Sequence, residues 1–244
     1  MITDWKFTYK LSPKCTYKNL PSTRAIKFTS EKDARGSSWV TGFIISIYNM
    51  NKKQAMERAK IKARNIAIII SLKVGNPVSE SHVGTCYKLH GKKNERWKVS
   101  SSLTSRYNIF ENLALDISQG TIGRLIGENK PLNERMYHAY LGLKAYQEGL
   151  YEAVIIQFYQ AIEKVSSLSH IRSKYEPLRG ILSHPEIQRK DTIKRLKTNF
   201  PTAKIQCTSS ESFDYFSPKN NEFLKAKAKE LMKSAMKYLR KELM

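Results

Sequence analysis

The segment 52–75 constrains the fold most, because its apolar residues recur at intervals of three or four positions. This spacing places them along one side of a helix and predicts a single apolar stripe that another layer must cover. Gly75 and Pro77 follow the last apolar position and end the predicted helix. The stripe consists of Met56, Ala59, Ala63, Ile66, Ile70 and Val74.

Strand patterns lie on both sides of this helix. Residues 4–11 alternate between apolar and polar side chains, and residues 37–48 are rich in aromatic and β-branched side chains. The stretches "GTCYKLHG" and "RWKVSSSLT", which follow the helix, predict two further strands. Residues 1–104 are therefore predicted to form a small α+β domain, in which one amphipathic helix packs on a mostly antiparallel sheet.

Helical periodicity replaces the strand patterns after about residue 105, so residues 105–244 are predicted to form an all-α bundle. The helix at 150–168 is apolar on more than one face, which is typical of a helix in the middle of a bundle or at an interface between two copies. The predicted helices cover residues 108–118, 133–147, 150–168, 171–185, 186–200 and 221–243.

The charge of the chain is strongly unbalanced. It carries 43 Lys and Arg against 21 Asp and Glu, a formal net charge of +22. Residues 1–104 hold 20 basic and 6 acidic side chains, a net of +14, so the first domain is the more cationic one. Such an excess predicts a polyanionic partner, and RNA, DNA and an anionic membrane surface are the candidates. A solvated cationic surface is the alternative.

The first half of the helix at 52–75 concentrates basic side chains that can follow a phosphate backbone. Aromatic residues of the neighbouring strands, Trp39, Tyr48, Tyr87 and Trp97, can stack on unpaired bases. The alternative is a solvated helix face and a core of aromatic side chains. The predicted nucleic-acid-binding residues are Lys52, Lys53, Arg58, Lys60, Lys62 and Arg64.

The three cysteines are far apart and form no CxxC pair, which indicates free thiols in a reducing compartment. The first residues lack the apolar core of a signal peptide, and the longest apolar run, residues 66–72, is too short to cross a bilayer. We therefore expect a cytoplasmic protein without a membrane partner. P-loop, GxGxxG, HExxH and GxSxG motifs are absent from the sequence, so nucleotide hydrolysis, zinc proteolysis and serine hydrolysis have no support.

His82, Cys86 and His90 are the one group with regular spacing among possible metal ligands. In a strand they share a face, but successive members lie about 13 Å apart, which is too far for one ion. Neither a metal site nor a cofactor is therefore expected.

Two stretches of the second half resemble the HEPN superfamily, the higher-eukaryotes-and-prokaryotes nucleotide-binding domain. They are "GLYEAVIIQFYQAIEKV" and, some ten residues later, "LRGILSHP", with Arg179 and His184 at the spacing of the family's Arg-x4–6-His motif. The resemblance covers about residues 130–200. It implies a helical bundle that dimerises. Many members are metal-independent ribonucleases of toxin, abortive-infection or RNA-processing systems, while others only bind. Gly180 departs from the polar residue, often Asn, that commonly follows the motif arginine.

The chemistry of such a site is consistent with these two residues. His184 can accept the proton of an RNA 2′-hydroxyl near neutral pH, and Arg179 can stabilise the charge that builds up on the phosphorane. Five positions correspond to about 140° on a straight helix. In one copy, Arg179 and His184 therefore point in different directions, unless the helix end is distorted at Gly180 and Pro185. A homodimer through the helical domain can instead bring both into one cleft. The alternative is that Arg179 pairs with Glu176 or Glu186, and that His184 only caps the helix.

The leading prediction is a metal-independent RNA endonuclease with Arg179 and His184 as catalytic residues and RNA as its partner. A protein partner such as an antitoxin stays open. The rival hypothesis is a non-catalytic nucleic-acid-binding or regulatory protein of the same fold. A third is a module for a small ligand or a protein, in which the charge is incidental.

Overall fold

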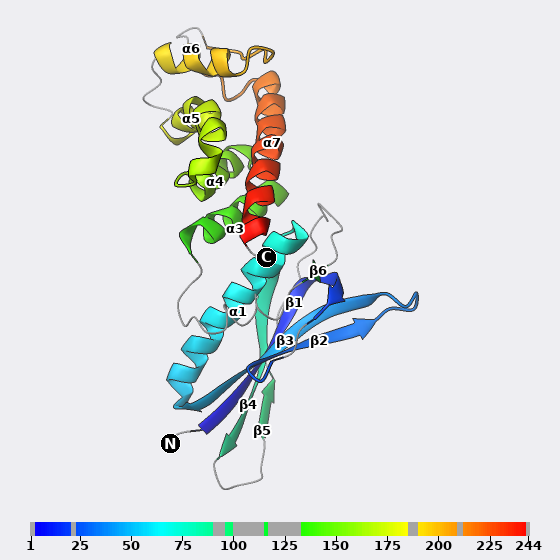
Figure 1. Cartoon of the computed structure of the whole chain (residues 1–244). Helices are drawn as coiled ribbons and strands as arrows, with labels where there is room; N and C mark the ends of the chain where they lie inside the picture. Colours follow the sequence, from blue (N-terminus) through cyan, green and yellow to red (C-terminus); the bar gives the residue numbers. More distant parts are fainter. Residues whose placement is uncertain are drawn as a thin grey trace. The chain divides into compact units, whose positions relative to one another are not determined.

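The computed structural model of the chain describes residues 3–20, 23–89, 96–99, 115–116, 133–184, 190–208 and 212–242. The chain divides into two compact units, one formed by Met1–Asn133 with Arg240–Met244 and the other by Glu134–Leu239 (Figure 1). The first unit holds the strands of the sheet and one long helix, and the second unit is built from helices, so the α+β class is confirmed. The predicted domain boundary at 104/105 lies outside the described residues.

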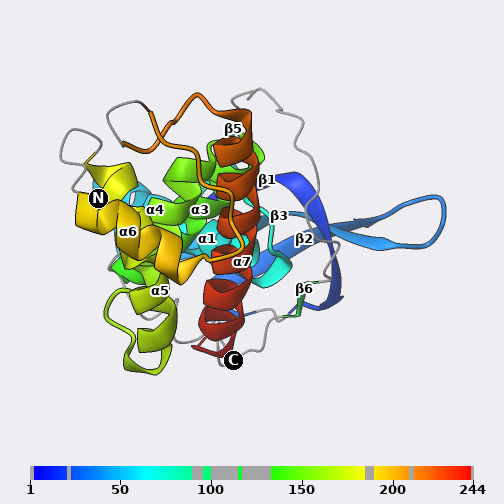
Figure 2. The same cartoon turned by 90° about the horizontal axis from the view of Figure 1, so that it is seen from above.

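The first unit is built on an antiparallel sheet with the order β2-β3-β1-β4-β5. The first strand is central: Lys6 pairs with Ser46 of β3 on one side and with Cys86 of β4 on the other. A short strand, β6 (Leu115–Asp116), pairs in parallel with the end of β1 at Tyr17. Figures 1 and 2 show the β2–β3 hairpin reaching beyond the rest of the sheet. The antiparallel strands are β1 (Thr3–Asn19), β2 (Ile26–Lys32), β3 (Ser38–Met50), β4 (Ser79–Leu89) and β5 (Arg96–Val99).

Helix α1 (Lys52–Val74) covers one face of this sheet. Asn51 caps its start by accepting a hydrogen bond of 3.0 Å from the Gln54 N–H, and Gly75 ends it at a φ of 76°. The predicted stripe is buried against the strands with one exception. Met56 is 37% exposed, and Ala55, on the other edge of the stripe, is buried instead.

The second unit consists of helices, and its consecutive helices α3 to α6 contact one another in chain order. Among the helices that the structure describes, none is both long and apolar enough to cross a membrane. The elements are α3 (Glu134–Gln147), α4 (Tyr151–Ile162), the 3-10 helix η1 (Ser166–Leu168), α5 (Ser169–Ser183), α6 (Lys190–Asn199) and α7 (Pro218–Glu242), the last of which contributes residues up to Leu239.

Two helix predictions need correction. The helix expected at 150–168 ends at Ile162, where the Arg172 guanidinium donates a hydrogen bond to the Glu163 carbonyl and Val165 turns into an extended conformation. A side chain from α5 thus satisfies a carbonyl at the end of α4. Of the helix expected at 108–118 only 115–116 are described, and these form β6 because they pair with β1.

Helices α3 and α4 are in close contact because Gly142 has no side chain. A β-carbon at this position would lie 2.6 Å from Cε2 of Phe158, a ring that is fully buried in the core of the unit. Gly149, at a φ of 75°, makes the turn between the two helices. Within a single chain most of α4 is covered, since Glu152 is its one exposed residue and the other residues are buried or partly buried. Its apolar character therefore places it in the middle of the unit and does not require a second copy.

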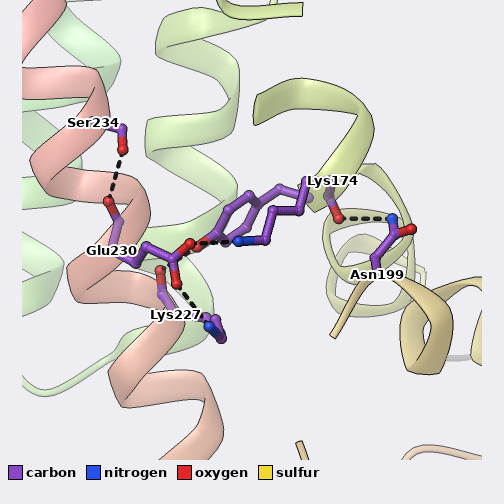
Figure 3. A network of polar contacts seen from close by, with 6 residues as sticks. Lys174, Asn199, Lys227, Glu230 and Ser234 are labelled. Carbon is purple, nitrogen blue, oxygen red and sulfur yellow. Dashed lines mark hydrogen bonds and ion pairs between the residues drawn. The ribbon is translucent and has the colours of Figure 1, made fainter. Parts of the chain in front are cut away.

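A polar network joins α5, α6 and α7 (Figure 3). Glu230 of α7 accepts hydrogen bonds of 2.7 Å from both Lys174 and Lys227. Partial burial alone would raise the pKa of Glu230, but these two ammonium groups lower it. Pro177, inside α5, has no N–H to offer the Ser173 carbonyl four residues earlier. The Asn199 side chain of α6 donates to that carbonyl at 3.1 Å and so fixes α6 against α5.

Candidate functional site

Arg179 lies in the second half of α5 and points toward α4. Its guanidinium carbon is 5.5 Å from the centre of the Tyr159 ring, and its Nη2 is 3.8 Å from Oε1 of Glu163. Its Nε is buried without a hydrogen-bond partner, while about a third of the side chain, 32%, remains accessible. The guanidinium is thus held over an aromatic ring with part of its edge available to an anion.

One of the two acidic residues expected to form an ion pair with Arg179 does not do so. Glu176 forms its ion pair with Arg195 of α6, and Glu186 lies outside the described residues. Glu163 follows α4, so its proximity to Arg179 depends on how α4 and α5 pack.

A cluster of charged residues therefore surrounds the Tyr159 hydroxyl. Burial raises the pKa of Tyr159, and the carboxylates of Glu163 and Glu176 raise it further, while Arg179 and Arg172 oppose them. The sequence held one signal of this cluster. Arg172, Glu176 and Arg179 are spaced four and three positions apart, which puts them on one face of α5.

His184 is the residue at which α5 ends. Its backbone N–H donates to the Gly180 carbonyl at 3.1 Å, and its side chain is exposed. Gly180 does not distort the helix, which continues through it to Ser183. Five positions correspond to about 140° on a straight helix, and His184 itself lies just past α5 at a φ of −139° and a ψ of 65°, so regular helix geometry does not place it on the face of Arg179. Pro185 lies outside the described residues.

The six basic residues predicted on α1 do not form one face. Because Ala55, Ala59 and Ala63 face the sheet, the helix angle of about 100° per residue sets the others on two flanks. Lys53, Lys60 and Arg64 share the first flank and are exposed, together with Glu57. Arg58 and Lys62 share the second.

The second flank is the less accessible one. Burial lowers the pKa of Lys62, and the positive charge of Arg58 lowers it further. Lys52, at the first position of the helix, is exposed. The more accessible cationic surface of α1 is therefore the row formed by Lys53, Lys60 and Arg64.

The predicted stacking residues have structural partners where their side chains are described. The Trp39 Nε1 donates to Asp33 at 3.0 Å, and this bond and others lower the pKa of that carboxyl. The Tyr48 hydroxyl donates to the Arg24 carbonyl at 2.9 Å, with the Arg24 guanidinium 5.0 Å from the ring centre. The side chains of Tyr87 and Trp97 lie outside the described residues.

The His82 imidazole forms a hydrogen bond of 2.9 Å with the Thr85 hydroxyl and contacts the Phe7 and Tyr9 rings. Its two predicted companions, Cys86 and His90, lie outside the described side chains. In the described part of the chain, no three His, Cys, Asp or Glu side chains converge as metal ligands would.

Comparison of the chain with protein-family models, with characterised proteins and with solved structures finds no significant match. The resemblance to HEPN domains therefore stays a prediction from the motif.

Proposed function

We propose that the protein is a cytoplasmic, metal-independent RNA endonuclease whose reacting groups are Arg179 and His184 of two neighbouring copies. One observation supports this proposal above the others. A partly accessible arginine, held over an aromatic ring, and an exposed histidine occur on the last two turns of the same helix. The net charge of +22 provides the general attraction for RNA.

The proposed step is an attack of the RNA 2′-hydroxyl on the adjacent phosphorus. His184 accepts the proton of that hydroxyl, the P–O5′ bond breaks, and the leaving 5′-oxygen takes a proton from water, which gives a 2′,3′-cyclic phosphate and a 5′-hydroxyl; the imidazolium then returns its proton to the solvent. Arg179 neutralises the charge that grows on the equatorial oxygens. Since DNA lacks the 2′-hydroxyl, it resists cleavage.

The offset of about 140° that five positions give on a straight helix motivates the second copy. In a two-fold arrangement, His184 of one copy faces Arg179 of the other across a shared cleft. The proposal therefore includes a homodimer through the helical unit, and a monomer in solution at micromolar concentration contradicts it.

A second candidate function is non-catalytic nucleic-acid binding, and a specific observation favours it. Glu163 lies 3.8 Å from Arg179, so the protein itself partly neutralises the cation that catalysis requires. In this case the motif stabilises the packing of α4 and α5, and the exposed basic rows bind RNA without cutting it.

Cleavage assays on tRNA and mRNA in EDTA separate the two candidates. We expect His184→Ala and Arg179→Ala to abolish cleavage, and Arg179→Lys to restore it only in part, because a point charge does not reproduce the planar guanidinium. His170→Ala is the matched control, since His170 is an exposed histidine of the same helix outside the motif. If the intact protein cuts no RNA, or if both histidine variants cut equally well, the endonuclease proposal fails.

A further inference from the structure

A pocket of about 570 Å³ opens beside α6 in the helical unit. This volume lies within the range of about 300–1,000 Å³ that is usual for ligand sites. Five lining residues come from α6 and one from the loop that follows it. They are Lys190, Ile193, Lys194, Lys197, Thr198 and Cys207.

The lining is strongly cationic. Lys190, Lys194 and Lys197 follow one another at spacings of four and three, so they share one face over about 10 Å of helix. Lys194 and Lys197 are exposed, and no described carboxylate lies within ion-pair distance of either. By contrast, Lys174 and Lys227 of the same unit share Glu230 (Figure 3). The positive charges of Lys194 and Lys197 are therefore available to an external anion.

The helix that carries these lysines is held firmly. Leu196 is buried, and the Phe200 ring, just after the helix, packs edge-on against Tyr175 and Phe223, each at 5.4 Å between ring centres. The Asn199 side chain donates to two carbonyls of α5, those of Ser173 and Lys174. The backbone that carries these lysines is thus held in place by its packing, which lowers the entropic cost of binding an anion.

We propose that this pocket binds consecutive phosphates of a single RNA strand. The proposal deepens and rests on the proposed function, because it identifies where the substrate is held. The ion pair between Arg195 and Glu176 joins α6 to α5 three residues before Arg179. Arg195 and Asn199, which contact α5, lie about 140° and 180° around α6 from Lys190, so the strand is held on the side of α6 that faces away from those contacts. Three ammonium groups in a row suit a polyanion better than a ligand with one charge.

Binding of a short labelled oligouridine tests the proposal in a His184→Ala background, where cleavage is removed. We expect Lys194→Ala with Lys197→Ala to weaken binding about tenfold near physiological salt, since two phosphate contacts are lost. The slope of log K against log salt should fall by about 1.4, or about 0.7 for each contact to a single strand. The matched control is Lys229→Ala with Lys233→Ala, two exposed lysines of α7, which should change the affinity less than about twofold.

Cys207 provides a second measurement that leaves the lysines unchanged. Its thiol lines the pocket and is half-buried, whereas Cys15 is buried with a pKa raised by that burial. With Cys86→Ser also in place, alkylation by N-ethylmaleimide reports on Cys207, and RNA should slow it. Equal losses of affinity in both lysine pairs, or no protection of Cys207 by RNA, overturn the proposal. Protection by inorganic phosphate but not by RNA also overturns it. If the pocket binds RNA but the intact protein cuts none, the endonuclease proposal fails while the pocket stands.

Discussion

Replacing each of two helical glycines of the second unit with alanine should change the free energy of unfolding in opposite directions. Gly142 of α3 faces the ring of Phe158, where a new β-carbon would lie 2.6 Å from Cε2 and 2.7 Å from Cδ2. Gly180 of α5 has no atom within 4 Å of the same position. Both lie inside helices, so the same substitution gives the same gain in helix propensity at both sites.

The expected magnitudes follow from this geometry. Alanine is favoured over glycine in a helix by about 1 kcal/mol, so Gly180→Ala should raise the free energy of unfolding by about that amount. At Gly142 this gain is opposed by overpacking, which costs about 1–3 kcal/mol when a well-packed core must yield. Phe158 is fully buried and has little room to move. Gly142→Ala should therefore lower the free energy of unfolding by about 1 kcal/mol, a difference of about 2 kcal/mol between the variants.

Urea unfolding followed by circular dichroism at the helix band measures both changes. Tryptophan fluorescence reports on the first unit alone, because Trp5, Trp39 and Trp97 all belong to it. Adding Phe158→Leu to Gly142→Ala removes the ring, and a double-mutant cycle should give a favourable coupling of about 1 kcal/mol or more. Equal stabilisation by both alanines, or a coupling near zero, would refute the reasoning.

Three other expectations concern activity, binding and pH. Gly180→Asn fits the open space beside Gly180 and should raise the rate of RNA cleavage; an unchanged rate counts against the motif. Substituting Glu for Lys53, Lys60 and Arg64 should weaken RNA binding and flatten its salt dependence more than substituting Glu for Arg58 and Lys62. Filter-binding assays over a range of salt concentrations measure both effects. Burial raises the pKa of Cys15 to about 12 from a usual 9.0, so the free energy of unfolding should fall as the pH rises above about 9. Cys15→Ala should make that decline shallower in urea titrations.

Patterns along the chain predicted most of the elements, and the exceptions have physical causes. The stripe from Ala59 to Val74 and the stop at Gly75 depend on neighbours in the sequence, so periodicity identified them. Met56 was misplaced because periodicity alone could not decide between two adjacent positions at the edge of the stripe. The end of α4 at Ile162 depends on Arg172 from another helix, which no local pattern contains.

The candidate site was predictable only as a list of residues. The motif gave Arg179 and His184, but the contact of Arg179 with Tyr159 and Glu163 depends on the packing of α4 against α5. The basic content of α1 was evident from the sequence, whereas its division into two flanks required the position of the sheet. The α6 pocket was not predicted, because lysines at the spacing of Lys190, Lys194 and Lys197 are also typical of a solvated helix face, and the contribution of Cys207 depends on the fold.

The central place of β1 has a consequence for synthesis of the protein. This strand leaves the ribosome before both of its partners: β3 follows after β2, and β4 follows only after the whole of α1. Until β4 has emerged, the edge of β1 that pairs with it is unpaired in the nascent chain, which is the condition under which strands associate wrongly. Pairings so distant along the chain also raise the contact order, and folding slows accordingly. We therefore expect the first unit to acquire protease resistance only after residues 79–89 have left the exit tunnel.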